Sequence, residues 1–210
     1  MIVDDHLMFA ESMARLLSDE GNIRVVGGAS TGGEGLTLIS QLEPDVVLID
    51  FHLPDRNGVE VAAEVKARNP KTIVVMLTAS TDDRVLVAAI DAGCSGFLTK
   101  DRAASEVADA VRAAAAGEAL ISPAQLARLL PNLTRSQPAV GADLTARERE
   151  LLQHLALGQT NKVIAAELHL SVNTVRNYVQ SVLTKLNAHS KLEAVATAVR
   201  AGIIEYPMGP

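Results

Sequence analysis

The sequence is poor in cysteine and in aromatic residues. Its 210 residues include one cysteine, no tryptophan and only 2% aromatic residues. A single thiol excludes a disulfide framework and a zinc site built from several cysteines, and it fits a reducing compartment. No apolar run approaches the length of a membrane-spanning helix, and the first residues are acidic rather than basic and then apolar. We therefore expect a cytoplasmic protein with cores of Ala, Val, Leu and Ile.

The residues that are present suffice for two modest domains of different charge. Hydrophobic residues make up 48% and charged residues 21%, which excludes a disordered chain. Residues 1–120 hold 19 acidic and 10 basic side chains, whereas residues 143–210 hold 6 acidic and 7 basic ones. This asymmetry predicts two different roles. An acidic first part is a poor phosphate binder, and the second part can bind nucleic acid only with its cations gathered on one face.

The first part of the chain alternates between strand and helix patterns. Short apolar runs rich in β-branched residues predict strands that are buried on both faces of a parallel sheet. They are Ile2–Val3, Ile23–Val26, Asp45–Asp50, Thr72–Leu77 and Gly96–Thr99. Helical patterns lie between them at Leu7–Glu20, Gly33–Leu42, Gly58–Arg68, Asp83–Ala92 and Ser105–Ala116. This order predicts an α/β doubly wound, five-stranded parallel sheet of the flavodoxin-like kind.

A connector and a purely helical segment follow. Ser122, Pro123 and Gln125 predict a short capped helix that ends near Leu130, and Pro131 to Asp143 reads as a flexible linker. The last segment has no strand pattern, and its capping signals predict a small all-α domain of four helices. These helices are expected from Thr145 to Gly158, over Asn161–Leu168, from Ser171 to Leu186 and from Ser190 to Gly202.

Polar side chains follow four of the predicted strands. Asp4 and Asp5 come after the first, Asp50 ends the third, Thr78 follows the fourth and Lys100 the fifth. The carboxyl ends of parallel strands meet at one edge of a sheet, so we expect these groups to converge. Three carboxylates that repel one another favour a bound divalent cation, and an oxygen-only site suits Mg²⁺. Each residue alone is also explained as a turn or helix cap, but their joint placement favours the site.

These residues stand in motifs that resemble the receiver domain of bacterial two-component response regulators. The resemblance covers about residues 1–120 and predicts a receiver domain over residues 1–118. Its motifs are Ile2–His6 (IVDDH), Val47–Pro54 (VLIDFHLP), Gly58, Leu77–Ala79 (LTA) and Gly96–Lys100 (GFLTK). Members of the family have several more residues before the aspartate pair, so the resemblance also implies a longer first strand than this chain offers.

The resemblance implies a role for each of these residues. Asp50 is implied to be the phosphoacceptor. Asp5 and Asp50 are implied to bind Mg²⁺ directly, Asp4 through water, and His52 through its backbone carbonyl. Phosphoryl transfer needs a nucleophile in line and neutralisation of the phosphoryl charge, which fits such a set.

Three further roles concern the phosphoryl group and the response to it. Thr78 and Lys100 are implied to contact the phosphoryl oxygens. Phe97 is implied to be a switch residue that turns inward when Thr78 moves. Plain core packing is the alternative explanation for Phe97, because a buried aromatic side chain in a strand needs no special purpose.

The third helix of the last segment has two contrasting faces. Apolar residues at spacings of three and four predict one buried stripe of Val172, Val175, Val179, Val182 and Leu186. The opposite face carries Asn173, Arg176, Asn177, Gln180 and Thr184. Arg, Asn and Gln are side chains that match base edges in the major groove. The preceding short helix and tight turn complete a helix-turn-helix, although periodicity alone also fits an ordinary bundle helix.

The segment resembles the LuxR-type helix-turn-helix over residues 143–204. Its motifs are Leu144–Leu151 (LTAREREL), Gly158, Asn161-Lys162, Ile164-Ala165, Ser171–Arg176 (SVNTVR) and Lys185-Leu186. The resemblance implies a DNA-binding domain over residues 143–210, preceded by a linker over residues 119–142. It implies that bases are read by Arg176, Asn177 and Gln180, and that the DNA backbone is held by Asn161, Lys162, Thr174 and Lys185. Tyr178 and Val163 depart from the common pattern of His and Glu, which leaves the target sequence open.

The combined motifs predict a phosphorylation-controlled transcriptional regulator rather than an enzyme. Its expected partners are a sensor histidine kinase and double-stranded promoter DNA, with a homodimer as the active form and no membrane partner. The apolar residues of the fourth helix, Leu192, Val195, Ala196 and Val199, either complete the core or in part face that second subunit.

Two alternatives stay open. One is a phosphate-independent DNA-binding regulator whose first domain binds a ligand or dimerises. The other is a phosphoryl-transfer enzyme such as a dehalogenase-like phosphatase. Enzymes of that kind carry a second aspartate two residues after the first, and this chain has His52 at that position.

Overall fold

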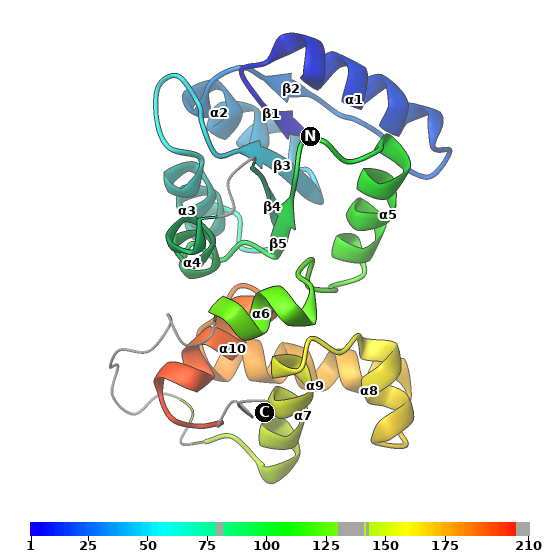
Figure 1. Cartoon of the computed structure of the whole chain (residues 1–210), viewed down its shortest axis with the longest axis vertical. Coiled ribbons are helices and arrows are strands. Elements are labelled where there is room, and N and C mark those ends of the chain that lie inside the picture. Colours follow the sequence, from blue (N-terminus) through cyan, green and yellow to red (C-terminus); the bar gives the residue numbers. More distant parts are fainter. Residues whose placement is uncertain (79–81, 130–140, 142, 205–210) are drawn as a thin grey trace.

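The first domain is a five-stranded parallel sheet with the strand order β2-β1-β3-β4-β5. In the computed structural model, residues 1–78, 82–129, 141 and 143–204 are described. The strands are β1 (Ile2–Val3), β2 (Gly28–Ala29), β3 (Val46–Asp50), β4 (Ile73–Leu77) and β5 (Gly96–Leu98). The order reverses between β1 and β3, which confirms the predicted flavodoxin-like, doubly wound fold (Figure 1).

Helices cover both faces of the sheet. One face packs against α1 (Leu7–Asp19) and α5 (Ala104–Ala115), and the other against α2 (Gly32–Leu42), α3 (Gly58–Arg68) and α4 (Asp83–Asp91). Val46 and Leu48 of β3 point into the first core, and Val47 and Ile49 into the second, because successive strand residues face opposite sides. Burial on both faces explains why β3 is a continuous apolar run.

The position of the second strand was predicted wrongly. The pattern indicated Ile23–Val26, whereas the strand that pairs with β1 is Gly28–Ala29. The reason is the register: β1 spans Ile2–Val3, and these two residues lie opposite Gly28 and Ala29, so the pairing does not reach residues 23–26. Residues 23–26 therefore have no strand beside them, and their apolar side chains pack at the edges of the two cores instead.

The connector begins with the predicted capped helix. In α6 (Pro123–Leu129), the Ser122 hydroxyl accepts from the Gln125 amide at 3.1 Å, and the Gln125 side chain accepts from the Ser122 amide at 3.2 Å. Leu126 and Leu129 are buried, so α6 packs as part of the core. The predicted flexible stretch from Pro131 to Asp143 lies almost entirely outside the described residues.

The last domain contains the four predicted helices: α7 (Ala146–Ala156), α8 (Asn161–Glu167), α9 (Val172–Lys185) and α10 (Lys191–Arg200). Thr145 and Glu148 form the predicted capping box of α7. Of the expected buried stripe on α9, Val172 is 36% exposed, because it lies at the very start of the helix, and this part of the prediction was wrong. None of the described helices is long and apolar enough to cross a membrane.

The two domains lie against each other, with α6 beside their junction (Figure 1). A single apolar cluster runs from the α2–α4 side of the sheet through α6 into the helical domain. At the junction the Ser190 hydroxyl donates to the Cys94 carbonyl at 3.0 Å. Gly93 (φ +84°) lies so close to α10 that an added Cβ would stand 3.2 Å from the His189 Cβ. The domains therefore meet through a packed surface, with Leu192, Val195 and Ala196 of α10 buried in it and in the helical core.

Candidate functional sites

Buried carboxylates gather at the carboxyl edge of the sheet. Asp4 follows β1 and is fully buried, and Asp50 ends β3 and is 3% exposed. Lys100 follows β5, and its ammonium lies 2.8 Å from Asp4 Oδ2 and 2.8 Å from Asp50 Oδ2. The three predicted residues from three different strands thus share one site, as expected for strand ends of a parallel sheet.

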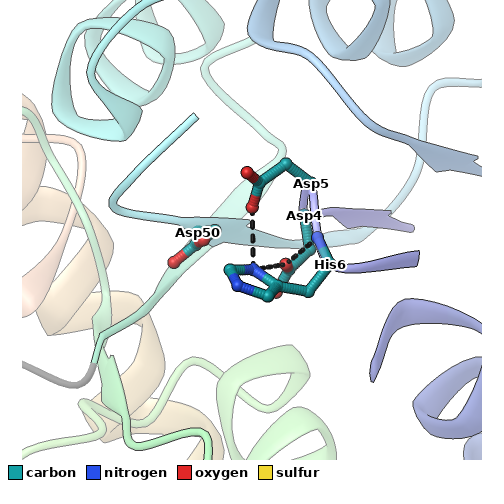
Figure 2. A group of neighbouring side chains, drawn as sticks. All are labelled: Asp4, Asp5, His6 and Asp50. Atoms are coloured by element: carbon teal, nitrogen blue, oxygen red, sulfur yellow. Dashed lines mark hydrogen bonds and ion pairs between the residues drawn. The ribbon is translucent and has the colours of Figure 1, made fainter. Parts of the chain in front are cut away.

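Asp5 and His6 form the outer part of this site (Figure 2). His6 Nδ1 lies 2.8 Å from Asp5 Oδ1 and 3.3 Å from Asp4 Oδ1, and the His6 amide donates to Asp4 Oδ1 at 2.9 Å. His6 was not among the predicted site residues. The sequence feature that could have indicated it is its place directly after the aspartate pair. There the start of α1 turns the imidazole of His6 back over the carboxylates.

The electrostatics of the site follow from burial. Burial raises the pKa of the Asp50 carboxyl, and this effect outweighs the hydrogen bond and charge of Lys100. Burial also works against the charge of Lys100, but the hydrogen bonds to Asp4 and Asp50 outweigh it and raise the pKa of that ammonium. The Lys100 ammonium is therefore the charge that offsets two buried carboxylates.

The site offers ligand atoms of the kind that a hard cation binds. Oxygen atoms of Asp4, Asp5 and Asp50 and a ring nitrogen of His6 all lie within 4.8 Å of one another. Carboxylate oxygens at this spacing are ligands that Mg²⁺ prefers, and the cation relieves their repulsion. His52 is exposed in the segment after β3, two residues beyond Asp50, and its backbone amide donates to that carboxylate.

Thr78 and Phe97 line one cavity. Thr78 is buried after β4, and its amide donates to the Leu98 carbonyl at 2.9 Å. Phe97 on β5 is 9% exposed, so its ring lies inside the protein. The cavity has a volume of about 290 Å³ and is also lined by Gln125 and Arg128 of α6. The two predicted switch residues therefore share space with the connector helix.

The predicted base-reading side chains lie together on α9. Arg176, Asn177 and Gln180 are all exposed, on the face opposite the buried Val175 and Val179. This arrangement is the one that the sequence pattern predicted for the helix.

The four residues predicted to hold the DNA backbone are in different environments. Lys162 is exposed at the start of α8. Thr174 lies near the start of α9 with its hydroxyl 2.8 Å from that of Ser171. Asn161 is buried, and Lys185 is partly buried. Only Lys162 among the four therefore offers an exposed cation.

Lys185 forms an ion pair with a buried carboxylate. Its ammonium lies 2.8 Å from Glu148 Oε2 and donates to the Asp143 carbonyl at 3.1 Å. Ser181 donates to the other Glu148 oxygen at 2.6 Å. Burial works against the charge of Glu148, but these hydrogen bonds outweigh it and lower its pKa to about 2. Sequence reasoning missed this structural role because Glu148 lies on α7, whereas Ser181 and Lys185 lie more than 30 positions further along the chain on α9.

We expect the ion pair and hydrogen bonds of Glu148 to make the free energy of unfolding depend on pH in the acidic range. A carboxylate with a lowered pKa stabilises the folded state above its ordinary value of 4.5, and this contribution is lost as the pH falls towards 2. Glu148→Gln should lower the free energy of unfolding at pH 7 by about 1.5–3 kcal/mol, the value of a hydrogen bond to a charged group. Its thermal midpoint should then vary less than that of the wild type between pH 4.5 and 2. Glu150→Gln on the same helix is the control, and equal pH profiles for the wild type and Glu148→Gln would contradict the prediction.

A groove separates the reading face of α9 from the first domain. It has a volume of about 670 Å³ and is lined by Arg176 and Gln180 on one side and by Lys66, Lys71 and Glu118 on the other. Such a volume is that of a small-ligand pocket. Receiver residues therefore face Arg176 and Gln180 across this groove.

Comparison with known families assigns both domains. Residues 1–112 match the response regulator receiver domain, and residues 142–198 match the luxR family of bacterial regulatory proteins. The probable transcriptional regulatory protein NarL of Mycobacterium tuberculosis is 35% identical over 98% of this chain and 95% of its own length. The response regulator protein VraR of Staphylococcus epidermidis is 34% identical over 98% of both chains.

Solved structures agree with this assignment. The signal receiver domain of the putative response regulator NarL from Mycobacterium tuberculosis matches with a TM-score of 0.54 and 37% identity over 56% of this chain and 94% of that one. The response regulator ChrA of a heme-sensing two-component system matches with a TM-score of 0.50 and 29% identity over 97% of both chains.

The fold and both sites thus define a signalling protein that joins a receiver domain to a DNA-binding domain. The chain belongs to the two-component response regulators with a LuxR-type helix-turn-helix, a family of transcriptional regulators.

Proposed function

We propose that Asp50 is the residue through which this regulator receives its signal. A carboxylate oxygen of Asp50 attacks the phosphorus of a phosphohistidine on a sensor kinase, the P–N bond breaks, and the released imidazole takes up a proton. The observation that carries the proposal is the pairing of Lys100 with both Asp4 and Asp50, which places a cation beside the nucleophile. In this scheme Lys100 and Thr78 contact the new phosphoryl oxygens.

We further propose that Mg²⁺ is held at the same site by Asp4, Asp5, Asp50 and the carbonyl of His52. The bound cation neutralises the carboxylates and the incoming phosphoryl oxygens. The close approach of the three carboxylates supports this assignment. His6 positions Asp5 through the contact between its ring and that carboxylate.

Mg²⁺ is expected to stabilise the wild type more than a variant that lacks Asp5. A cation that binds only the folded state adds about 2.7 kcal/mol at a concentration one hundred times its dissociation constant. Asp5→Ala removes a direct ligand, so most of the Mg²⁺-dependent rise in melting temperature should disappear. Glu11→Ala, an exposed carboxylate on α1, is the matched control and should respond to Mg²⁺ like the wild type. Equal shifts in the wild type and Asp5→Ala would place the cation elsewhere.

We propose that residues 143–210 read promoter DNA through Arg176, Asn177 and Gln180, with Lys162 and Thr174 on the backbone. Residues 1–118 form the receiver and residues 119–142 the linker. The groove in which receiver residues face Arg176 and Gln180 supports a closed resting form in which these side chains do not reach a duplex. Phosphorylation then favours separation of the domains and pairing of two chains on DNA. The shared cavity of Thr78, Phe97 and α6 offers a route by which a change at the phosphorylation site reaches the connector.

The test is DNA binding with and without phosphorylation. Purified protein is incubated with genomic fragments in the presence or absence of a small phosphodonor and Mg²⁺, and the protected sites are mapped. We expect protection of discrete sites with paired half-sites about one helical turn apart, at lower protein concentration when the donor is present. Equal protection under both conditions would favour the phosphate-independent alternative, and no discrete protection would overturn the proposed function.

A further inference from the structure

An acidic side chain of the receiver reaches into the DNA-binding domain. Gly117 adopts a left-handed conformation (φ +79°) directly after α5, and the chain turns there so that Glu118 faces α8 and α10. Glu118 Oε1 accepts from the Asn161 amide at 3.2 Å, and Glu118 Oε2 lies 3.0 Å from the Lys191 ammonium. The carboxylate is thus held by two groups of the other domain.

Lys191 is a buried cation whose charge is balanced from the receiver. Its side chain is only 6% exposed, and its ammonium also donates to Asn161 Oδ1 at 2.8 Å. Burial lowers the pKa of Lys191, the nearby Arg176 acts in the same direction, and Glu118 opposes both. Among the described residues, Glu118 is the one carboxylate within ion-pair distance of Lys191. Without Glu118, the Lys191 ammonium and the Asn161 amide lack an anionic partner.

The same groups border the proposed DNA-binding face. The resemblance to the LuxR-type family implies that Asn161 holds the DNA backbone, and the charge of Arg176 on the reading helix lowers the pKa of Lys191. Arg176, Asn161, Lys191 and Glu118 all line the groove between the domains. A phosphodiester, like a carboxylate, presents anionic oxygens that accept hydrogen bonds from an ammonium and a backbone amide.

We propose that Asn161 and Lys191 form a seat for one DNA phosphate and that Glu118 occupies this seat while the domains are closed. This inference rests on the proposed function. Removing one partner of a buried ion pair leaves the charge of the other uncompensated. When the receiver moves away and takes Glu118 with it, the binding of a DNA phosphate to Lys191 is therefore favoured. Glu118 therefore competes with DNA for the same donors, and the competition links domain closure to DNA affinity.

The first arm of the test removes the competing carboxylate. Glu118→Gln keeps the shape of the side chain and loses its charge. Glu106→Gln is the matched control on α5, because Glu106 is exposed and its ion-pair partner is Arg102 of the receiver itself. Without phosphodonor, Glu118→Gln should bind the specific duplex roughly tenfold more tightly than the wild type, within the usual range of allosteric coupling. Glu106→Gln should bind like the wild type. In the phosphorylated proteins the difference should largely disappear.

The second arm removes the seat in the phosphorylated protein. Lys191→Gln should weaken binding to specific and scrambled duplexes alike and reduce the slope of log affinity against log salt by about one, because one phosphate contact is lost. Lys191→Arg keeps the charge and should retain most of the slope, and melting temperatures of both variants check the fold. A slope unchanged in Lys191→Gln, or wild-type affinity in unphosphorylated Glu118→Gln, overturns the inference.

Two controls separate the possible failures. In the first control, inorganic phosphate is added to Glu118→Gln at constant ionic strength, and the melting temperature is measured with Lys191 present and with Lys191 replaced by Gln. If phosphate raises the melting temperature only when Lys191 is present, while Lys191→Gln leaves the salt slope of DNA binding unchanged, the seat binds a free anion and our inference is overturned. Arg176→Ala is measured on the same duplexes. If it loses specificity while Lys191→Gln behaves like the wild type, the seat is wrong and the proposed function stands. If neither substitution nor phosphorylation alters DNA binding, the proposed function itself fails.

Discussion

Asp50→Asn is expected to abolish phosphorylation of the protein. With Mg²⁺ and a phosphodonor, the wild type should gain one acid-stable, base-labile phosphoryl group, as an acyl phosphate does, and the variant should gain none. An amide is not a nucleophile here, whereas the carboxylate of Asp50 is held in place by Lys100 at 2.8 Å. The readout is the intact mass together with the lability of the label in acid and base. Phosphodonor should then no longer raise the affinity of the variant for DNA.

The matched control is Asp45→Asn, an exposed aspartate just before β3, at the opposite end of the strand that Asp50 closes. It should be labelled like the wild type. Undiminished labelling of Asp50→Asn would show that another side chain accepts the phosphoryl group, and the assignment of the whole acidic site would have to be revised.

Arg176→Ala is expected to weaken binding to the specific site and to relax the base preference at one position in each half-site. An arginine that contacts a guanine with two hydrogen bonds contributes about 1–3 kcal/mol to discrimination, which is roughly a 5- to 150-fold change in affinity for the specific site. The phosphorylated protein is used so that the receiver does not mask α9. Affinity for a panel of duplexes with single base changes should show relaxed preference at one position in each half-site.

Lys162→Ala is the contrasting variant, because Lys162 is exposed at the start of α8 and is assigned to the backbone. It should weaken all duplexes alike and flatten the salt dependence. Lys185 is a poorer choice for this comparison, since its removal also leaves the buried Glu148 without its cation. If Arg176→Ala weakens specific and scrambled duplexes equally, α9 is not the helix that reads bases.

The convergence of the acidic site could be predicted because it needs only the strand order and the polarity of a parallel sheet. Once β1, β3 and β5 are parallel neighbours or near neighbours, Asp4, Asp50 and Lys100 must lie at the same edge. The ion pairs of Lys100 with both carboxylates, and the place of His6 above Asp5, depend on side-chain directions that a linear pattern does not carry.

The sequence alone determined the features that depend on neighbours within about four positions. The capping box of Thr145 and Glu148, the start of α6 at Pro123 and the exposed face of α9 are set by local hydrogen bonds and by helical periodicity. The buried strands β3 and β4 were also predictable, since short apolar runs rich in β-branched residues are typical of a sheet covered on both faces.

Only the tertiary structure decided which distant groups become partners. The second strand lies at Gly28–Ala29 because these residues lie opposite Ile2 and Val3, the two residues of β1. The Glu193 carboxylate accepts from the His189 amide at a point where α10 packs against the receiver. Lys191 meets Glu118, 73 positions away along the chain. Such contacts depend on how whole elements pack, and their energy does not appear in any short stretch of sequence.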